Sequence, residues 1–192
     1  MVEPTEASAA RQASIIEAAL GVFLRYGFKK TSMDDLARAA GLSRQGLYLH
    51  FPTKEALFKA MVTHSIETMR AAARETLARE DLELEDRVLG AFDAMSSKGV
   101  GSENLDELLA TTIQLVGPVV CGFEESFLAD LTRVLRAAGV AGRWKAAGIS
   151  VKDLAEHLFA ASIGIKRQAK TPDEYRERMR VAVRLVCGSA PQ

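Results

Sequence analysis

A short run of hydrogen-bonding side chains begins at Arg44 and Gln45 and continues with Tyr48 and His50. Arginine can donate two hydrogen bonds to the acceptors of guanine, and glutamine can pair with the edge of adenine. Gly46 lies inside this run and has no side chain, which would let a helix come close to a nucleic acid. Because glycine inside a helix costs roughly 1 kcal/mol relative to alanine, its presence here favours a functional reason. We therefore expect Arg44 and Gln45 to read base edges.

The segment that must position these side chains, residues 32–51, predicts two short helices joined by a tight turn. Ser32 and Asp35 have the spacing of a capping box at the start of the first helix. Gly41 can adopt the left-handed conformation that ends it, and Ser43 offers the next N-cap. Two helices connected in this way form a helix-turn-helix. Such a hairpin also occurs in proteins that never bind DNA.

The flanking residues supply candidate contacts to phosphate. Thr31 and Ser32 present hydroxyls at one helix start, and Lys54 opens a further helix, where free amides favour anions. From Arg11 to Lys59 there are 8 basic against 4 acidic residues, a balance of +4, whereas from residue 65 onward 17 basic residues face 19 acidic ones, a balance of −2. This asymmetry fits a nucleic-acid-binding head on an acidic body.

The run TSMDDLARAAGLSRQGLYLHFPTKEALF resembles the N-terminal domain of the TetR family of bacterial transcriptional regulators. The turn Tyr26-Gly27-Phe28, the Tyr48 to Phe51 run and the Lys54 to Phe58 segment match that family's pattern. The resemblance covers roughly Ala9 to Met69, and beyond it only the layout is similar. It implies a helix-turn-helix domain over 9–69, with the motif at 32–51, and an effector-binding and dimerisation domain over 70–192.

The resemblance also implies a ligand-responsive transcriptional regulator, by the family's habit a repressor, that binds palindromic operator DNA as a homodimer. It suggests contacts from Tyr48 and His50 at the end of the recognition helix. The complete set of predicted DNA-binding residues is Thr31, Ser32, Arg44, Gln45, Gly46, Tyr48, His50 and Lys54.

Two apolar stripes near the C-terminus fit a dimer interface, in which two helices pair with their symmetry mates. Burial of the same stripes inside one chain fits the pattern equally well, and the resemblance favours the dimer. The predicted interface residues are Leu154, Leu158, Ala161, Ile165, Tyr175, Met179, Ala182 and Val186.

An effector pocket is implied by the resemblance, with a change in tilt of the fourth helix as the response to an unidentified small molecule. For each candidate wall residue an ordinary place in the core is the commoner role, because aromatic and methionine stripes are how any helical domain packs. The candidates are Met69, Phe92, Met95, Phe123, Phe127 and Trp144.

Composition supports a globular all-α chain of about nine helices: 48% of its 192 residues are apolar, 26% are charged, and no strand pattern competes. Two cysteines without paired spacing argue against a disulfide framework or a cysteine-rich metal site and favour the cytoplasm. Ile15 to Leu24 contains an acid and lacks a basic leader, so we expect no signal peptide. The longest uncharged stretch, Leu108 to Phe123, is too short and interrupted for a membrane span.

An enzyme is disfavoured, because His50, His64 and His157 lie on different expected helices without a nucleophile or phosphate loop nearby. Asp153 and His157 share a helix face, but two ligands do not make a metal site. We expect no metal and no cofactor. The alternative to a regulator is a helical protein-interaction module whose helix-turn-helix no longer binds DNA. The basic residues retained around the motif favour the regulator.

Overall fold

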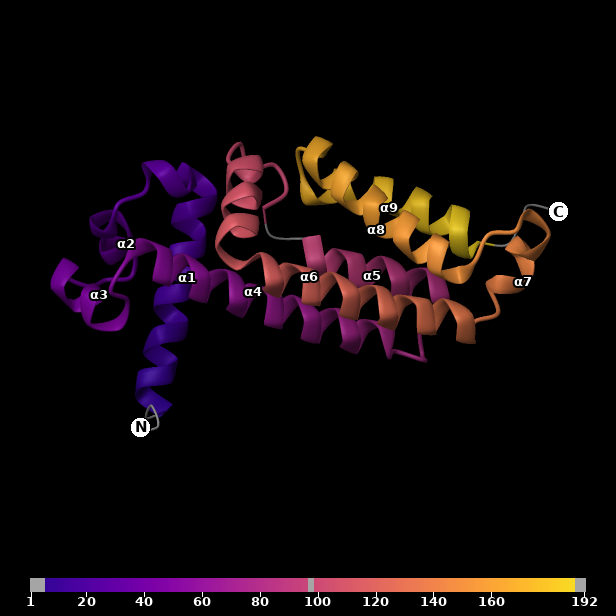
Figure 1. Cartoon of the computed structure of the whole chain (residues 1–192), viewed down its shortest axis with the longest axis horizontal. Coiled ribbons are helices and arrows are strands. Elements are labelled where there is room, and N and C mark those ends of the chain that lie inside the picture. The colour runs from indigo at the N-terminus through magenta and orange to yellow at the C-terminus, as the bar shows by residue number, and fades with distance from the viewer. Residues whose placement is uncertain (1–5, 97–98, 189–192) are drawn as a thin grey trace. The chain divides into compact units, whose positions relative to one another are not determined.

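The computed structural model describes residues 6–96 and 99–188, and within this part of the chain every regular element is a helix (Figure 1). The all-α prediction is confirmed. The helices in chain order are α1 (Glu6–Lys30), α2 (Met33–Ala39), α3 (Arg44–His50), α4 (Lys54–Leu77), α5 (Leu84–Ser96), α6 (Leu105–Ala137), α7 (Ala141–Trp144), a 3₁₀ turn (Lys145–Ala147), α8 (Val151–Gln168) and α9 (Pro172–Cys187).

The chain forms two compact units that are not contiguous in sequence. The first contains the described chain up to Ile66 and also Ser102–Val120, and the second contains Glu67–Gly101 and the described chain from Cys121 onward. Helices α4 and α6 each contribute residues to both units. The predicted division into 9–69 and 70–192 assigns Ser102–Val120 to the second domain, whereas the structure has this segment in the first unit.

Aromatic packing holds the first unit together. Phe58 of α4 meets Phe23 and Phe28 edge-on, with ring centroids 5.1 Å and 5.0 Å apart. Gly27 allows Phe28 to turn back into this core, because the Gly27 backbone angles, φ 79° and ψ 170°, interrupt α1 at the Tyr26-Gly27-Phe28 turn. A φ of this sign is one that glycine adopts without steric cost.

Residues 102–107 close the end of α1. The Ser102 hydroxyl donates to the carbonyl of Leu24 at 2.7 Å, and the Asn104 amide donates to the carbonyl of Arg25 at 2.9 Å. A carboxylate oxygen of Glu107 accepts from the backbone amide of Lys29 at 2.8 Å. The bonds to Leu24 and Arg25 satisfy carbonyl groups that the last turn before Gly27 leaves without partners.

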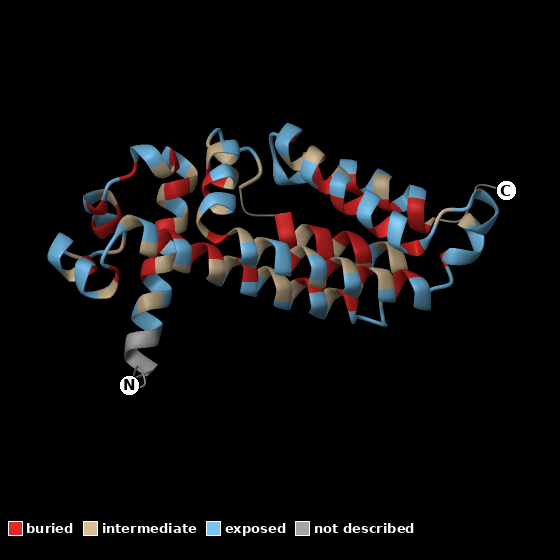
Figure 2. Ribbon diagram, viewed as in Figure 1, coloured by how far each residue is buried: buried red, intermediate tan, exposed pale blue. Residues whose placement is uncertain are grey.

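The second unit is built from antiparallel helices, with α8 and α9 forming a hairpin packed on α5 (Figure 1). The buried positions of α8 and α9 lie on the sides that face the other helices of this unit (Figure 2). Tyr175 and Met179 of α9 are almost completely buried. One ring cluster, Phe92, Phe123, Phe127 and Phe159, joins α5, α6 and α8.

Two expectations about helix ends are wrong. The pair Gly117-Pro118 predicts the end of a helix, because proline breaks a helix that it interrupts. Helix α6 instead continues through this pair with a kink at Val116, whose φ of −139° and ψ of 28° are non-helical. The kink places Pro118 near the start of the second helical segment, where its missing amide costs nothing. The glycines between Gly139 and Gly148 predict a loop, but this segment contains α7 and the 3₁₀ turn.

The length of α6, counted across its kink, also bears on membranes. It is the one helix in the described residues that is long and apolar enough to cross a bilayer by length and composition, with 11% of its most apolar window buried. One such helix is weak evidence for a span, because core helices of the same composition meet the criterion too.

Candidate nucleic-acid interface

Local capping fixes the helix-turn-helix as the sequence predicts. The Ser32 hydroxyl accepts from the amide of Asp35 at 3.2 Å, and the Asp35 carboxylate accepts from the amide of Ser32 at 3.0 Å, a complete capping box. The hydrogen bonds that the Asp35 carboxylate accepts from the Ser32 hydroxyl, at 2.5 Å, and from the Ser32 amide lower the pKa of Asp35. Gly41 adopts φ +64°, and the Ser43 hydroxyl caps α3 by accepting from the amide of Gly46 at 3.0 Å. The turn at Gly41 and the Ser43 cap therefore fix the start of α3 within the motif.

Helix α3 buries one side and leaves the other open. Leu47 is completely buried, whereas Arg44, Gln45 and Tyr48 are exposed. Leu49 is 83% exposed, although it is an apolar residue. Leu49 is not among the predicted DNA contacts, and its place one turn after Gln45 puts it on the same side of α3 as that residue.

Arg44 is held near the outer edge of α3 by weak contacts. Its guanidinium lies 3.3 Å from a carboxylate oxygen of Asp34 and 5.7 Å from the ring centroid of Tyr48. Tyr48 first, and Asp34 second, raise the pKa of Arg44. Because exposed ion pairs contribute little, the guanidinium can exchange Asp34 for a stronger acceptor.

A local packing constraint, which the sequence did not reveal, also favours glycine at position 46. A Cβ atom at this position would lie 3.2 Å from the Ser43 hydroxyl oxygen, which is tighter than an ordinary contact. A side chain here would press on the atom that caps α3. Both this packing constraint and a close approach to DNA would favour glycine at this position.

Thr31 and Lys54 make their hydrogen bonds inside the first unit. The Thr31 side chain is 3% exposed and donates to the carbonyl of Gly27 at 2.6 Å. The Lys54 ammonium donates to the carbonyls of Phe28 and Thr31, both at 2.8 Å, and lies 4.4 Å from the ring centroid of Phe28. Among the other predicted residues, Ser32 is exposed and His50 is half-buried in the last turn of α3.

Three of the six predicted effector residues pack together. Phe92 and Phe123 both pack on Phe127, at centroid distances of 5.3 Å and 6.3 Å, in a dense core. Met95 is buried and Met69 is half-buried. Trp144 belongs to α7, and its indole nitrogen lies 3.5 Å from the carbonyl oxygen of Val186.

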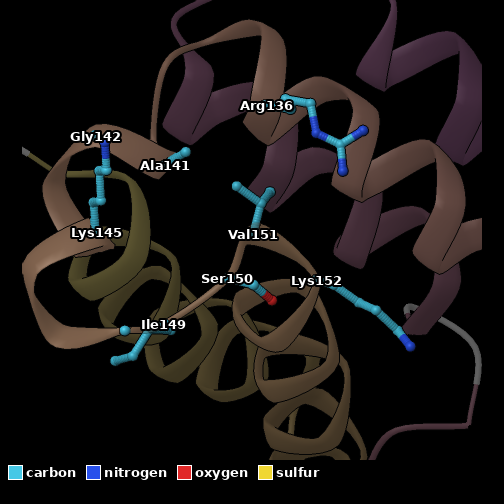
Figure 3. A pocket seen from close by; sticks show the side chains of 9 residues that line it. Arg136, Ala141, Gly142, Lys145, Ile149, Ser150, Val151 and Lys152 are labelled. Carbon is cyan, nitrogen blue, oxygen red and sulfur yellow. The ribbon is translucent and has the colours of Figure 1, made fainter.

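A shallow depression of about 620 Å³ lies beside the start of α8 (Figure 3). None of the six predicted effector residues lines it. Its lining is Arg136, Ala141, Gly142, Lys145, Gly148, Ile149, Ser150, Val151 and Lys152.

Most of the predicted dimer residues are used within one chain. Leu154, Leu158, Tyr175, Met179 and Val186 are buried, and Ala161, Ile165 and Ala182 are half-buried. The apolar side chains that α8 and α9 leave exposed are different ones: Ile163 (42%), Val181 (62%) and Leu185 (71%). Residues already buried by their own chain cannot face a partner, so a dimer surface on these helices would have to use the exposed set.

No cluster of three or more histidine, cysteine, aspartate or glutamate side chains suited to a metal ion occurs in the described part of the chain. Asp153 instead completes a capping box, because its carboxylate accepts from the amide of Ser150 at 2.8 Å.

Comparison with known proteins identifies relatives of the helix-turn-helix. Residues 15–61 match the model of the family described as "Bacterial regulatory proteins, tetR family". The HTH-type transcriptional regulator YfiR of Bacillus subtilis is 42% identical over 57 residues, which are 30% of this chain and 28% of that protein. The HTH-type transcriptional repressor Rv1474c of Mycobacterium tuberculosis is 40% identical over 70 residues, 36% of this chain and 37% of that protein. The chain thus spans about a third of the length of these curated relatives.

The fold of the whole chain also has relatives. The crystal structure of the TetR family transcriptional regulator PfmR from Thermus thermophilus superimposes with a TM-score of 0.67, covering 93% of this chain and 99% of that one. Sequence identity is 20%, so this likeness concerns the fold alone.

Proposed function

We propose that this chain, which belongs to the TetR family through its N-terminal domain, is a transcriptional regulator and, following the habit of that family, a repressor. It would bind palindromic operator DNA as a homodimer in the cytoplasm. It would respond to a small molecule. The observation that carries the proposal is the outer face of α3, where Arg44, Gln45 and Tyr48 stand exposed on a helix fixed at its start by Ser43. A rigid helix with an open row of donors is what reading of the major groove requires.

The exposed residues divide between reading bases and contacting phosphate. Arg44 and Gln45 lie in the first turn of α3 and would read guanine and adenine edges. Leu49 adds an apolar contact of the kind that recognises the thymine methyl group. Ser32, Tyr48 and His50 would contact phosphate, and Gly46 would allow close approach.

Thr31 and Lys54 take another role in this proposal. Their hydrogen bonds to Gly27, Phe28 and the backbone of Thr31 itself connect the loop before α2 to the start of α4. They would act as positioning residues that hold the helix-turn-helix in shape.

A dimer is needed because two recognition helices must enter successive major grooves, about 34 Å apart. The exposed apolar residues Ile163, Val181 and Leu185 on α8 and α9 are the proposed surface. Helices α4 and α6 each have residues in both units, so ligand binding in the second unit could alter the spacing of the recognition helices.

Replacing Arg44 with alanine tests base reading directly. We expect the preference for a selected operator over random DNA to fall by about 1–3 kcal/mol, the usual value of one bidentate base contact. Arg79→Ala is the charge-matched control, because Arg79 is exposed in the second unit and pairs with Asp81. Unchanged discrimination in Arg44→Ala would remove this residue from the reading helix.

The competing function is a helical interaction module that retains its helix-turn-helix without binding DNA. The exposed basic side chains Lys29, Lys30 and Arg44 around the motif favour the regulator. Failure of the parent protein to enrich any duplex from a random pool would favour the module.

A further inference from the structure

The arginine at the start of α3 has an acidic partner on α2. Arg44, the first residue of α3, donates from its guanidinium to a carboxylate oxygen of Asp34 at 3.3 Å. The two residues are ten positions apart in the chain, so this contact crosses the turn of the helix-turn-helix. Both side chains are largely open to solvent, with exposed fractions of 62% for Arg44 and 51% for Asp34. The pair therefore lies on the outer surface of the motif.

The capping box at the start of α2 does not use Asp34. Asp35 performs that role, because its carboxylate accepts from both the amide and the hydroxyl of Ser32. Arg38 follows Asp34 by four residues, which is the spacing of a helical ion pair, but its guanidinium lies 3.8 Å from Asp35. Asp34 thus contacts the recognition helix even though a basic residue follows one turn later on its own helix.

Stability gives little reason for an acid at position 34. The positive end of α2 favours a carboxylate in its first turn, but Asp35 already supplies one. An exposed ion pair adds little to the free energy of unfolding, so the contact with Arg44 does not hold the motif together. A negative charge beside the recognition helix also repels the phosphates of DNA. In a DNA-binding protein, Asp34 therefore carries a cost that stability does not offset.

Pairing with Asp34 changes what Arg44 can bind. An unpaired guanidinium is attracted to any phosphate, and this attraction is independent of DNA sequence. The Arg44–Asp34 pair has no net charge, so its attraction to phosphate is weaker. Arginine has more N–H donors than the two that a bidentate contact with guanine requires. An Arg44 side chain that keeps its contact with Asp34 can therefore still donate to guanine, whose acceptors are uncharged.

Tyr48 contacts the same guanidinium from within α3. It follows Arg44 by four residues and so shares its helix face, and its ring centroid lies 5.7 Å from the guanidinium carbon. The tyrosine ring and the Asp34 carboxylate thus approach Arg44 from two different helices. Side-chain freedom that is restricted before DNA binds does not have to be lost on binding.

We propose that Asp34 is a specificity-determining residue of this regulator, which keeps Arg44 available for guanine and weakens its attraction to phosphate. The inference rests on the proposed function, since it requires a chain that binds DNA through α3. Asp34 acts through Arg44 and is a positioning residue. Its replacement should raise the affinity for DNA in general and lower the preference for the operator.

Asp34→Asn tests this, because it removes the charge and keeps the size of the side chain. Affinity is measured against salt for a duplex that the parent chain selects from a random pool, and for a scrambled duplex of the same composition. We expect the ratio of the two affinities to fall roughly fivefold or more, the lower end of what one bidentate base contact contributes. On the scrambled duplex, the slope of log affinity against log salt should steepen by about 0.9, because Arg44 gains a phosphate.

The Arg44→Ala background shows whether Asp34 acts through Arg44. In this background Asp34→Asn should leave both the affinity ratio and the salt slope unchanged, because the guanidinium is absent. Glu17→Gln is the matched control, since it removes one exposed carboxylate from α1 of the same unit, and it should change neither quantity. Circular dichroism checks that each variant is folded.

Two outcomes would overturn the inference alone. One is an equal gain in affinity for both duplexes in Asp34→Asn, which would make Asp34 a residue that only repels DNA. The other is the same fall in the affinity ratio with and without Arg44. Failure of the parent chain to bind any duplex would instead contradict the proposed function, and this inference with it.

Discussion

The ammonium of Lys54 lies 2.8 Å from the carbonyl oxygen of Thr31, and this bond joins the start of α4 to the loop in front of α2. A second bond of the same length reaches the carbonyl of Phe28. Helices α2 and α3 lie in the chain between Thr31 and Lys54, so the contacts of Lys54 close a ring around the helix-turn-helix. Lys54 therefore supports the shape of the motif through two backbone carbonyl groups.

Replacing Lys54 with methionine should lower the free energy of unfolding by about 1–3 kcal/mol, because two carbonyls lose a charged donor. Urea denaturation followed by circular dichroism measures the change. Lys59→Met on the exposed side of α4 is the control and should change stability by less than about 0.5 kcal/mol.

Salt dependence distinguishes the two roles considered for Lys54. As a positioning residue, Lys54→Met should weaken DNA binding while leaving the slope of log affinity against log salt unchanged. A slope smaller by about 0.9, the value for one lost phosphate contact, would instead make Lys54 a direct phosphate ligand.

Two glycines of α1 should respond to alanine in opposite ways. Gly27 has φ +79°, and a Cβ atom there would lie 2.8 Å from a carboxylate oxygen of Glu107. Gly27→Ala should cost about 1–3 kcal/mol of stability. Gly21 is inside the helix with open space around it, so Gly21→Ala should stabilise by about 0.5–1 kcal/mol. Equal effects in chemical denaturation would show that the end of α1 is not held as described.

The dimer surface can be separated from the core of α9 by two kinds of variant. Val181→Glu and Leu185→Glu change exposed residues and should yield folded monomers in analytical ultracentrifugation. Met179→Ala removes a fully buried side chain and should cost about 2–5 kcal/mol of stability. Dimers that persist in both glutamate variants would move the interface away from this face.

The two cysteines should differ in reactivity. Cys121 is exposed, whereas burial raises the pKa of the Cys187 thiol to about 12. The thiolate is the reactive form, and a raised pKa makes it scarce at pH 8. Iodoacetamide should therefore alkylate Cys121 in the folded protein and Cys187 only after denaturation, as mass spectrometry of the modified peptides would show. Equal rates in the native state would contradict the burial of Cys187.

Helix starts could be predicted because caps depend on neighbours in sequence. Ser32 with Asp35 and Ser43 with Gly46 form the expected bonds, and Thr171 caps α9 in the same way by accepting from the amide of Glu174. The left-handed turn at Gly41 follows from the same local chemistry. The pair Gly117-Pro118 predicts a helix end that does not occur. Proline ends a helix whose interior it interrupts, but it is tolerated in the first turn of a helical segment that restarts after a kink.

Contacts between distant segments could not be predicted from the same patterns. The α9 stripe that contains Tyr175 and Met179 identifies an apolar face, but the pattern does not say whether α5 or a second chain covers it. The partners of Lys54 depend on where the loop at Phe28 lies in space.

The most direct test of the regulator is selection of bound sequences from a randomised duplex pool with the purified chain, followed by measurement of the winner's affinity against salt. We predict a two-fold symmetric sequence, bound by two chains, with an affinity that falls steeply as salt rises. Enrichment of no sequence, or equal affinity for the selected and scrambled duplexes, would contradict a sequence-reading dimer.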